Sequence, residues 1–313
     1  MRGVSQHPEQ RIVVGGEALV DLVNRPDGMI QPLLGGGPYN TARTIGRLGS
    51  RVDFLGGLST DRFGRQLAAA LERDGVGSGL VQCSDAPTTL AMVELDEHGS
   101  ASYRFYFDGT AAPALVAPAA PIDAAAVHVG TLGLVLEPMA SVLEVVVGSL
   151  HPSTLTMIDA NCRPVATADH AAYGARLERV LRSAHVLKVS SEDLDFLGSI
   201  SSVLGDTASL LALGPRVVLL TRGGDGVDIV TVDGCEHVDA VPVDVVDTIG
   251  AGDAFGGGFL ARWVQSGHGV DDLGRADLVR SAVELAARVA AITCGRAGAD
   301  PPHARDVQGW DTL

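Results

Sequence analysis

The 313-residue sequence predicts a doubly wound α/β fold, in which helices cover both faces of a mostly parallel sheet. From Ala126 onward, short strands rich in Val, Ile and Leu alternate with helical segments, which is the pattern of repeated βα units. Apolar residues make up 46 % of the chain and charged residues 19 %, as in globular proteins with a substantial core. We expect one domain over residues 1–313, with a small β extension.

The first part of the chain supplies two short strands and two helices. Arg11–Gly15 and Val52–Gly56 are β-branched or aromatic runs that end in glycine, as expected of strands. A helix is expected over Asn40–Leu48, directly after a cluster of glycines. The segment Asp61–Arg73 carries apolar residues on one side at helical spacing, and Asp61 is a suitable N-cap.

A hairpin follows, formed by Leu90–Leu95 and Ser102–Phe107 around the turn residues Asp96–Gly99. Its second strand alternates polar and aromatic residues, as a half-exposed strand does. Tyr103–Phe107 contains four of the eleven Phe and Tyr residues of the chain. Such a dense aromatic surface predicts that this hairpin packs against something.

The remainder alternates between apolar strands and helices. Strands are expected at 126–130, 155–159, 185–189 and 216–221, with a further β region over Gly226–Val241. Helices are expected at Pro138–Val147, Ala168–Arg182, Glu192–Leu197, Ala251–Gln265 and Asp277–Ile292.

Composition excludes several classes of protein. The net charge of −15 argues against nucleic acid or an anionic membrane as a partner. Gly109–Ile122 is uncharged but too short and proline-rich to span a bilayer, and Met1–Arg11 lacks the apolar core of a signal peptide. The four cysteines are widely spaced without a CxxC pair, so we expect reduced core thiols and a cytoplasmic location.

The strongest chemical signal is the glycine-rich segment Asp247–Gly256, which leads directly into a helix. Such a turn exposes backbone N–H groups, and the helix N-terminus adds about half a positive charge, so the segment is suited to a phosphate. A carboxylate at this position, Asp253, would repel that anion unless it accepts a proton from an attacking hydroxyl. The alternative is that Asp253 merely caps the helix.

A second glycine cluster, Gly35–Gly37, precedes the helix that contains Asn40. Glycines let a ligand approach the backbone closely, and the Asn40 amide offers the donor and acceptors that a polyol needs. Asp21 lies just beyond the carboxyl end of the first strand, where ligands bind in open α/β sheets. It could accept hydrogen bonds from sugar hydroxyls or could be a solvated surface residue.

The pairing of GGGPYNTARTIGRLG near the start with DTIGAGDAFGGGF near the end resembles the PfkB (ribokinase-like) carbohydrate kinases. The two motifs lie about 210 residues apart, and the intermediate stretches DANCRP, KVSSEDL, TRGGDG and CGRAGADP extend the resemblance over nearly the whole chain. The stretches GEALVDL, DANCRP and KVSSEDL look most like those of bacterial fructokinases. The resemblance implies a ribokinase-like fold with a β-sheet lid formed by about 17–34 and 88–112.

The resemblance also implies an activity, the transfer of the γ-phosphoryl group of ATP to a primary hydroxyl of a sugar, most similar to fructose phosphorylation. It makes Asp253 the catalytic base and the amides of Gly250, Ala251 and Gly252 the anion hole. Acceptor contacts would come from Asp21, Gly36, Gly37, Asn40 and Phe107, with Arg163 facing the phosphates. The nucleotide groove would contain Lys188, Ser190, Thr221, Gly223 and Gly226.

ATP and Mg²⁺ are the implied cofactors, with K⁺ as a further candidate. This chain has Ser190-Ser191-Glu192-Asp193 where many members have NxxE, so either Glu192 or Asp193 could contact a magnesium-bound water. Asp247 is the candidate for a monovalent cation site. Lids of this family often pair between two subunits, so a homodimer through the β lid is expected.

Two alternatives stay open at this point. The same fold could act on ribose, a nucleoside or a keto-deoxy sugar acid, because lid side chains choose the acceptor. A catalytically silent sugar-binding sensor could also use this fold, although the intact Asp253 and both glycine motifs count against it.

Overall fold

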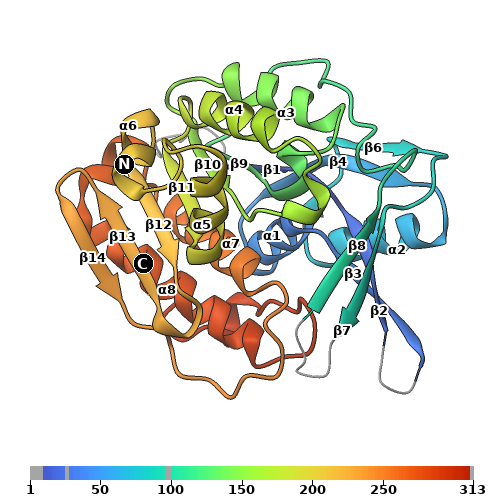
Figure 1. Cartoon of the computed structure of the whole chain (residues 1–313). Coiled ribbons are helices and arrows are strands. Elements are labelled where there is room, and N and C mark those ends of the chain that lie inside the picture. The colour runs from blue at the N-terminus through green and yellow to red at the C-terminus, as the bar shows by residue number, and fades with distance from the viewer. Residues whose placement is uncertain (1–9, 25–27, 96–100, 311–313) are drawn as a thin grey trace, which may run out of the picture.

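The computed structural model describes residues 10–24, 28–95 and 101–310, and these residues form two separate β-sheets (Figure 1). The larger has the order β14-β13-β12-β11-β10-β9-β1-β4-β5, and β6 also pairs with β4. All pairs from β12 to β5 are parallel, whereas β13 and β14 form an antiparallel edge. The predicted mostly parallel, doubly wound sheet is confirmed.

The strands of this sheet match the predicted runs within a few residues. They are β1 (Ile12–Gly15), β4 (Val52–Ser59), β5 (Val76–Gly77), β6 (Val81–Ser84), β9 (Ala126–Gly130), β10 (Leu155–Asp159), β11 (Val186–Ser190), β12 (Val217–Thr221), β13 (Val227–Thr231) and β14 (Gly234–Val238).

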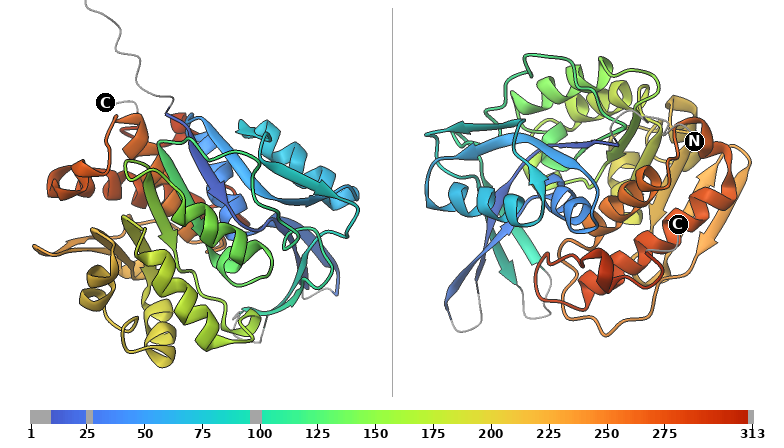
Figure 2. Two further views of the ribbon diagram at one scale, coloured as in Figure 1. Left: turned by 90° about the horizontal axis from the view of Figure 1, so that it is seen from above. Right: turned by 180° about the vertical axis from the view of Figure 1, so that it is seen from behind.

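Helices cover both faces of the sheet, as Figure 2 shows. One face carries α1 (Gly37–Arg47), α2 (Arg62–Arg73), α7 (Ala251–Gln265) and α8 (Ala276–Cys294). The other carries α3 (Met139–Gly148), α4 (His170–Leu181), α5 (Ser191–Ile200) and α6 (Thr207–Leu213). The sequence analysis did not identify α6.

The alternation of side chains along the strands creates a separate core on each face. In β1, Ile12 and Val14 pack under α7 and α8, whereas Val13 packs under the opposite helices, and all three are fully buried. This is why the strands read as continuous apolar runs rather than alternating ones.

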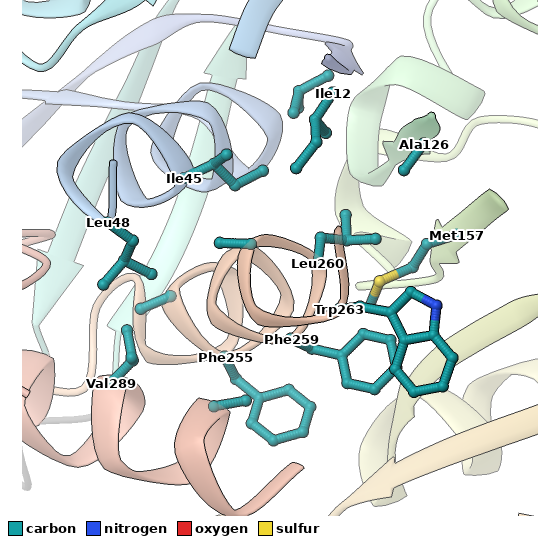
Figure 3. Close-up of a cluster of buried hydrophobic side chains, with 14 of the residues drawn as sticks. Ile12, Ile45, Leu48, Ala126, Met157, Phe255, Phe259, Leu260, Trp263 and Val289 are labelled. Carbon is teal, nitrogen blue, oxygen red and sulfur yellow. The ribbon is translucent and has the colours of Figure 1, made fainter. Parts of the chain in front are cut away.

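Helix α7 is the centre of the larger core (Figure 3). Phe259 and Trp263 stack with their ring centroids 5.7 Å apart, and both are fully buried. A side chain at Gly257 would place its Cβ 2.8 Å from Cβ of Thr44, so the glycine lets α1 approach closely. A helix that is apolar or small on all sides is expected to be buried in this way, and its position between α1 and α8 holds its N-terminal turn rigidly.

The second sheet has the order β3-β2-β7-β8 and projects from one side of the molecule, at the right in Figure 1. Its strands are β2 (Leu19–Asn24), β3 (Ile30–Gly35), β7 (Leu90–Leu95) and β8 (Ala101–Tyr106). They confirm the predicted lid, and the antiparallel pairing of β7 with β8 confirms the hairpin. The predicted turn residues 96–99 lie outside the described residues.

The cysteine prediction was partly wrong. All four thiols are free, but Cys83 and Cys235 are exposed rather than in the core, Cys294 is half-buried, and Cys162 alone is buried. Cys83 lies on the short edge strand β6 and Cys235 on the edge strand β14, where side chains are left uncovered. Among the described residues, no helix is both long and apolar enough to cross a bilayer.

Asp61 joins the base of the lid to the body, beyond its predicted role as the N-cap of α2. Its carboxylate accepts hydrogen bonds from the Gly64 N–H at 2.8 Å, the Thr88 N–H at 2.8 Å and the Thr88 hydroxyl at 2.6 Å. Burial raises the pKa of Asp61, but these bonds outweigh it and lower the pKa to about 2. Thr88 directly precedes the lid strands, so one carboxylate orders both elements.

We therefore expect Asp61→Ala to lower the free energy of unfolding by about 2 kcal/mol, since a helix cap and two further hydrogen bonds are lost. Because the pKa is depressed on folding, this contribution should be present above about pH 4 and lost as the pH falls from about 4 to about 2. Urea denaturation at both pH values measures it.

The matched control is Asp206→Ala, which removes the N-cap of α6, whose carboxylate bonds to Ser209 but not to the lid. It should lower the free energy of unfolding by clearly less than Asp61→Ala does, because a single exposed cap is lost. Equal losses for the two variants would contradict the role of Asp61 at the lid.

Candidate active site

A cavity of about 240 Å³ opens where the carboxyl ends of the parallel strands meet the lid and the N-termini of α1 and α7. Ligands of open α/β sheets bind at this edge. The predicted site residues that line the cavity come from both glycine motifs, from the segment before the first motif and from the chain between the two: Asp21, Gly36, Gly37, Asn40, Arg163, Gly250, Gly252 and Asp253.

Asp253 does not cap its helix. The N-cap position is Gly250, whose φ of 77° suits glycine, and no side chain caps this helix. Instead, the Asp253 carboxylate accepts a hydrogen bond from the Asn40 amide at 2.9 Å and faces the Asn161 amide at 3.5 Å. Burial raises the pKa of Asp253 to about 6, against the hydrogen bond from Asn40. The carboxylate thus lies inside the cavity at the helix N-terminus without serving as a cap.

Asp21 and Asn40 line the part of the cavity where the sequence analysis expected the phosphate acceptor to bind. The Oδ1 atom of Asn40 is buried and has no hydrogen-bond partner within the described part of the chain. Buried polar atoms are almost always hydrogen-bonded, so this oxygen is suited to accept a hydroxyl group of a ligand. Burial raises the pKa of Asp21 to about 7, with Arg163 opposing the shift.

Glycine at position 37 keeps the cavity open. A Cβ there would lie 2.6 Å from Oγ1 of Thr131 and 3.3 Å from both the Asn161 amide and the Asp253 carboxylate. Any side chain would therefore fill the space in front of Asp253, which explains the glycine cluster before α1.

Three residues that line the cavity were missed by the sequence analysis: Glu17, Thr131 and Asn161. Thr131 and Asn161 have positive φ angles of 55° and 33°, and the Asn161 amide donates to the Thr131 hydroxyl at 3.2 Å. Both follow the ends of neighbouring strands, β9 and β10, so their position after predicted strands was the available signal. Strained backbone of this kind is concentrated at functional sites.

Arg163 is held beside these residues. Its guanidinium donates to Oδ1 of Asn161 at 2.8 Å and to the Cys162 carbonyl at 2.9 Å. Among the described residues it is the one cation that lines the cavity, against the carboxyl groups of Glu17, Asp21 and Asp253. It therefore supplies local positive charge in an acidic pocket.

The lid contributes Tyr103 and Phe105 rather than the predicted Phe107. The two rings stack at 5.9 Å and line the cavity from β8. Strand alternation would give Phe107 the same direction, but β8 ends at Tyr106. The Phe107 carbonyl accepts hydrogen bonds from the Thr110 N–H and hydroxyl, and this turn places the Phe107 ring in a neighbouring cavity.

Two other predictions need correction. Lys188 does not lie along an open groove: it is buried, with its ammonium 2.9 Å from both carboxylate oxygens of Asp159. Lys188 lies on a strand among apolar residues, so its buried charge is compensated by the ion pair with Asp159. Ala251 does not line the cavity. Its N–H, predicted as part of the anion hole, donates to the Thr248 carbonyl within the turn.

The remaining nucleotide-side residues lie together but outside this cavity. Ser190 and Thr221 are register partners at the carboxyl ends of β11 and β12. Gly223 and Gly226 follow in a turn with φ angles of 55° and 95°. This places the predicted nucleotide side along the same sheet edge as the cavity.

Two of the residues predicted to contact a metal, Asp193 and Asp247, accept hydrogen bonds from backbone N–H groups. The Asp193 carboxylate accepts the N–H groups of Cys162 at 2.6 Å and Ser190 at 2.9 Å, whereas Glu192 is exposed. Asp247 accepts the N–H groups of Ile249 at 3.0 Å and Gly298 at 2.8 Å. No cluster of three or more metal-binding side chains occurs in the described ranges.

Residues 9–305 match the model of the pfkB family of carbohydrate kinases. This chain is a member of that family. The predicted ribokinase-like fold and sugar kinase activity are confirmed.

Several relatives of the kinase are named fructokinases. It is 33 % identical over 257 residues to the fructokinase of Rhizobium leguminosarum bv. trifolii, covering 80 % of this chain and 78 % of the relative. The fructokinase of Xylella fastidiosa with bound ATP has a TM-score of 0.85 at 28 % identity, covering 93 % and 94 % of the two chains. A fructokinase double mutant of Vibrio cholerae O395 with fructose, ADP and potassium ion has a TM-score of 0.82 at 25 % identity, covering 93 % and 94 %.

A kinase with another acceptor is also similar. Aminoimidazole riboside kinase of Salmonella enterica has a TM-score of 0.78 at 25 % identity, covering 92 % of this chain and 95 % of that one. The fold alone therefore does not choose between a sugar and a nucleoside.

The two lid aromatics provide a matched test. Phe105→Ala should raise the KM for the sugar about tenfold and change the KM for ATP less than threefold, because the ring faces the acceptor end of the cavity. Phe107→Ala, two residues further along the chain, should leave the KM for the sugar and the KM for ATP within about threefold of wild type. Steady-state kinetics with each substrate varied measures this, and the reverse ranking would restore Phe107 as the acceptor contact.

Proposed function

We propose that this kinase transfers the γ-phosphoryl group of ATP to a primary hydroxyl of fructose. The observation that carries the proposal is the Asp253 carboxylate, which is buried at the first turn of α7 and held by Asn40 inside the cavity. Its carboxylate makes no cap bond, so its burial has a cost that a catalytic base explains.

Each part of the cavity has a role in this reaction. Asp21 and the free Oδ1 of Asn40 bind acceptor hydroxyls, and Tyr103 and Phe105 cover the sugar from the lid. Asp253 accepts the proton of the attacking hydroxyl. The N-terminus of α7 at Gly250 and Gly252, with Arg163 nearby, stabilises the charge of the transferring group.

ATP would lie along the sheet edge from Gly250 toward Ser190 and Thr221, with Gly223 and Gly226 in the facing turn. Magnesium bound with the nucleotide neutralises phosphate charge. Glu192 is exposed at the start of α5, and Asp193 can still orient a metal-bound water while accepting amide N–H groups, so both remain predicted contacts. A K⁺ site formed by Asp247, together with the backbone carbonyl of Ile249, also remains a prediction.

The charge of the cavity favours a neutral acceptor. Three carboxyl groups, those of Glu17, Asp21 and Asp253, line it with one arginine. A sugar acid would bring a further negative charge into this low-dielectric space, at a cost that a neutral ketose avoids. The fructokinases among its relatives support fructose within the neutral sugars, and ribose or a nucleoside is the alternative.

The assembly and the location of the enzyme belong to the same proposal. Ile30 and Tyr106 are 53 % and 51 % exposed on the lid, which supports a homodimer through that sheet. Body and lid would act as a single domain of residues 1–313. Dependence on ATP supports the cytoplasm as the compartment.

Asp253→Asn separates the proposed base from a structural role, because the side chain keeps its shape and loses the basic oxygen. We expect a folded protein that binds sugar and ATP with kcat reduced by about two to four orders of magnitude. Calorimetric binding of fructose and a non-hydrolysable nucleotide, together with an ADP-release assay, measures both. Activity within about tenfold of wild type would reject the base, whereas a wild-type enzyme that phosphorylates no neutral sugar would reject the proposed acceptor.

The pH profile tests the same group independently. With a pKa of about 6, Asp253 is ionised above that pH, so kcat at saturating sugar, which depends less than kcat/KM on the binding groups Asp21 and Glu17, should fall about tenfold per unit below about pH 6. A coupled assay with saturating coupling enzymes at each pH measures the profile. A level profile down to pH 5 would contradict a base with a raised pKa.

A further inference from the structure

Glu17 is a buried carboxyl group that the proposed reaction does not use. It lies between β1 and β2, where the chain leaves the large sheet and enters the lid. Its exposed fraction is 1 %, and it lines the same cavity as Asp253. A carboxyl group buried to this degree is costly unless its hydrogen bonds compensate, so its contacts indicate its role.

Both oxygens of Glu17 bind backbone N–H groups that belong to the cavity wall. Oε1 accepts from Gly37 at 3.1 Å, where the chain returns from the lid strand β3 into α1. Oε2 accepts from Gly133 at 3.0 Å, in the short helical turn Thr131–Leu134. One side chain therefore joins the lid crossing, the start of α1 and the turn that carries Thr131.

We propose that Glu17 is a positioning residue for the acceptor: it holds the Gly36–Gly37 turn and the Thr131 turn at the distance that keeps Asn40 on Asp253. The chain of contacts is continuous. The Asn40 N–H donates to the Gly36 carbonyl at 2.9 Å, and the Asn40 amide donates to Asp253 at 2.9 Å. A shift of Gly37 would therefore move the group that orients the base. The inference rests on the proposed sugar kinase function.

A carboxylate is required here for a chemical reason. Two separate N–H donors point at one side chain, and a carboxylate offers an acceptor to each. A glutamine would turn its NH₂ group toward one of them and leave that buried donor unpaired. Burial raises the pKa of Glu17 to about 8, against the hydrogen bonds from its own N–H and from Gly37, so the variants are compared above that pH, where the carboxylate form predominates.

The lid has a second crossing that makes no such contact with the cavity. There, Asp61 binds Thr88, and the hydroxyls of Thr89 and Thr110 lie 2.6 Å apart. Both crossings attach the lid, but Glu17 alone among these groups lines the cavity. We therefore expect its loss to change acceptor binding selectively rather than to loosen the whole lid.

The test compares Glu17→Gln with the wild type and with Asp74→Asn. Asp74 is a carboxylate of similar burial, 7 % exposed, that binds Arg43 and Arg47 at the other end of the lid-to-body helix α1. Glu17→Gln should raise the KM for fructose at least about tenfold, with the KM for ATP within about threefold. Asp74→Asn should leave both KM values within about threefold even where it lowers the melting temperature. Glu17→Asp keeps the charge but not the reach, so it should fall between wild type and Glu17→Gln.

Hydrogen–deuterium exchange supplies a readout that does not need activity. Peptides that contain Gly37 and Gly133 should exchange at least about fivefold faster in Glu17→Gln and at the wild-type rate in Asp74→Asn. Unchanged exchange at these amides would overturn the proposal, and so would a fructose KM that equals that of the wild type. If the wild type phosphorylates no sugar, the proposed function fails, and exchange alone then decides the role of Glu17.

Discussion

One buried hydrogen bond, from the Asn40 amide to the Asp253 carboxylate at 2.9 Å, joins the two halves of the active site. Asn40 comes from α1, which follows the lid strands β2 and β3. Asp253 comes from the first turn of α7, where the proposal places the transferred phosphate. The two residues are 213 positions apart in the chain. The bond can exist because α1 and α7 pack closely side by side (Figure 3). Gly257 leaves room for Thr44 between the two helices. The large core thus sets the geometry of the base.

The parallel sheet supplies the rest of the site at one edge. Residues that follow the ends of β1, β9 and β10 point into the same cavity because parallel strands end on the same side. Thr131 and Asn161 adopt left-handed backbone angles there and hydrogen-bond to each other. The well-packed apolar strands below them, which are fully buried at Ile12, Val127 and Ile158, provide the stability that sustains such local strain.

Much of the fold could be predicted from the sequence because its signals are local. Helix α7 begins and ends where its glycine turn and apolar pattern indicate, and the hairpin of β7 and β8 follows from turn residues and alternation. The glycine motifs indicated Asn40 and Asp253, and the position after the first strand indicated Asp21. All three residues line the cavity. The short helix α6, which has seven residues, carried no comparable periodic signal.

The failures depend on contacts that local sequence patterns do not report, most of them between distant segments. Alternation gave Phe107 the same face as Phe105, but a hydrogen-bonded turn with Thr110 ends the strand first. Lys188 has the sequence context of a ligand-binding lysine, and only the neighbouring strand reveals Asp159 as its partner. The role of Glu17 depends on two backbone amides, 20 and 116 residues away, that no local pattern reports.

The cavity combines groups that a purely structural site would not retain. Three carboxyl groups line it around one arginine: Glu17 and Asp253 are buried, Asp21 is half-buried, and burial raises the pKa of all three. Apolar residues of similar size would be less costly in a folded protein of this kind. Each carboxyl group, however, faces a group that it can orient or from which it can take a proton: backbone amides, acceptor hydroxyls, and the attacking hydroxyl. The acidic cavity of this acidic protein is therefore best explained by binding of a neutral polyol, with the phosphate charge confined to the helix N-terminus and Arg163.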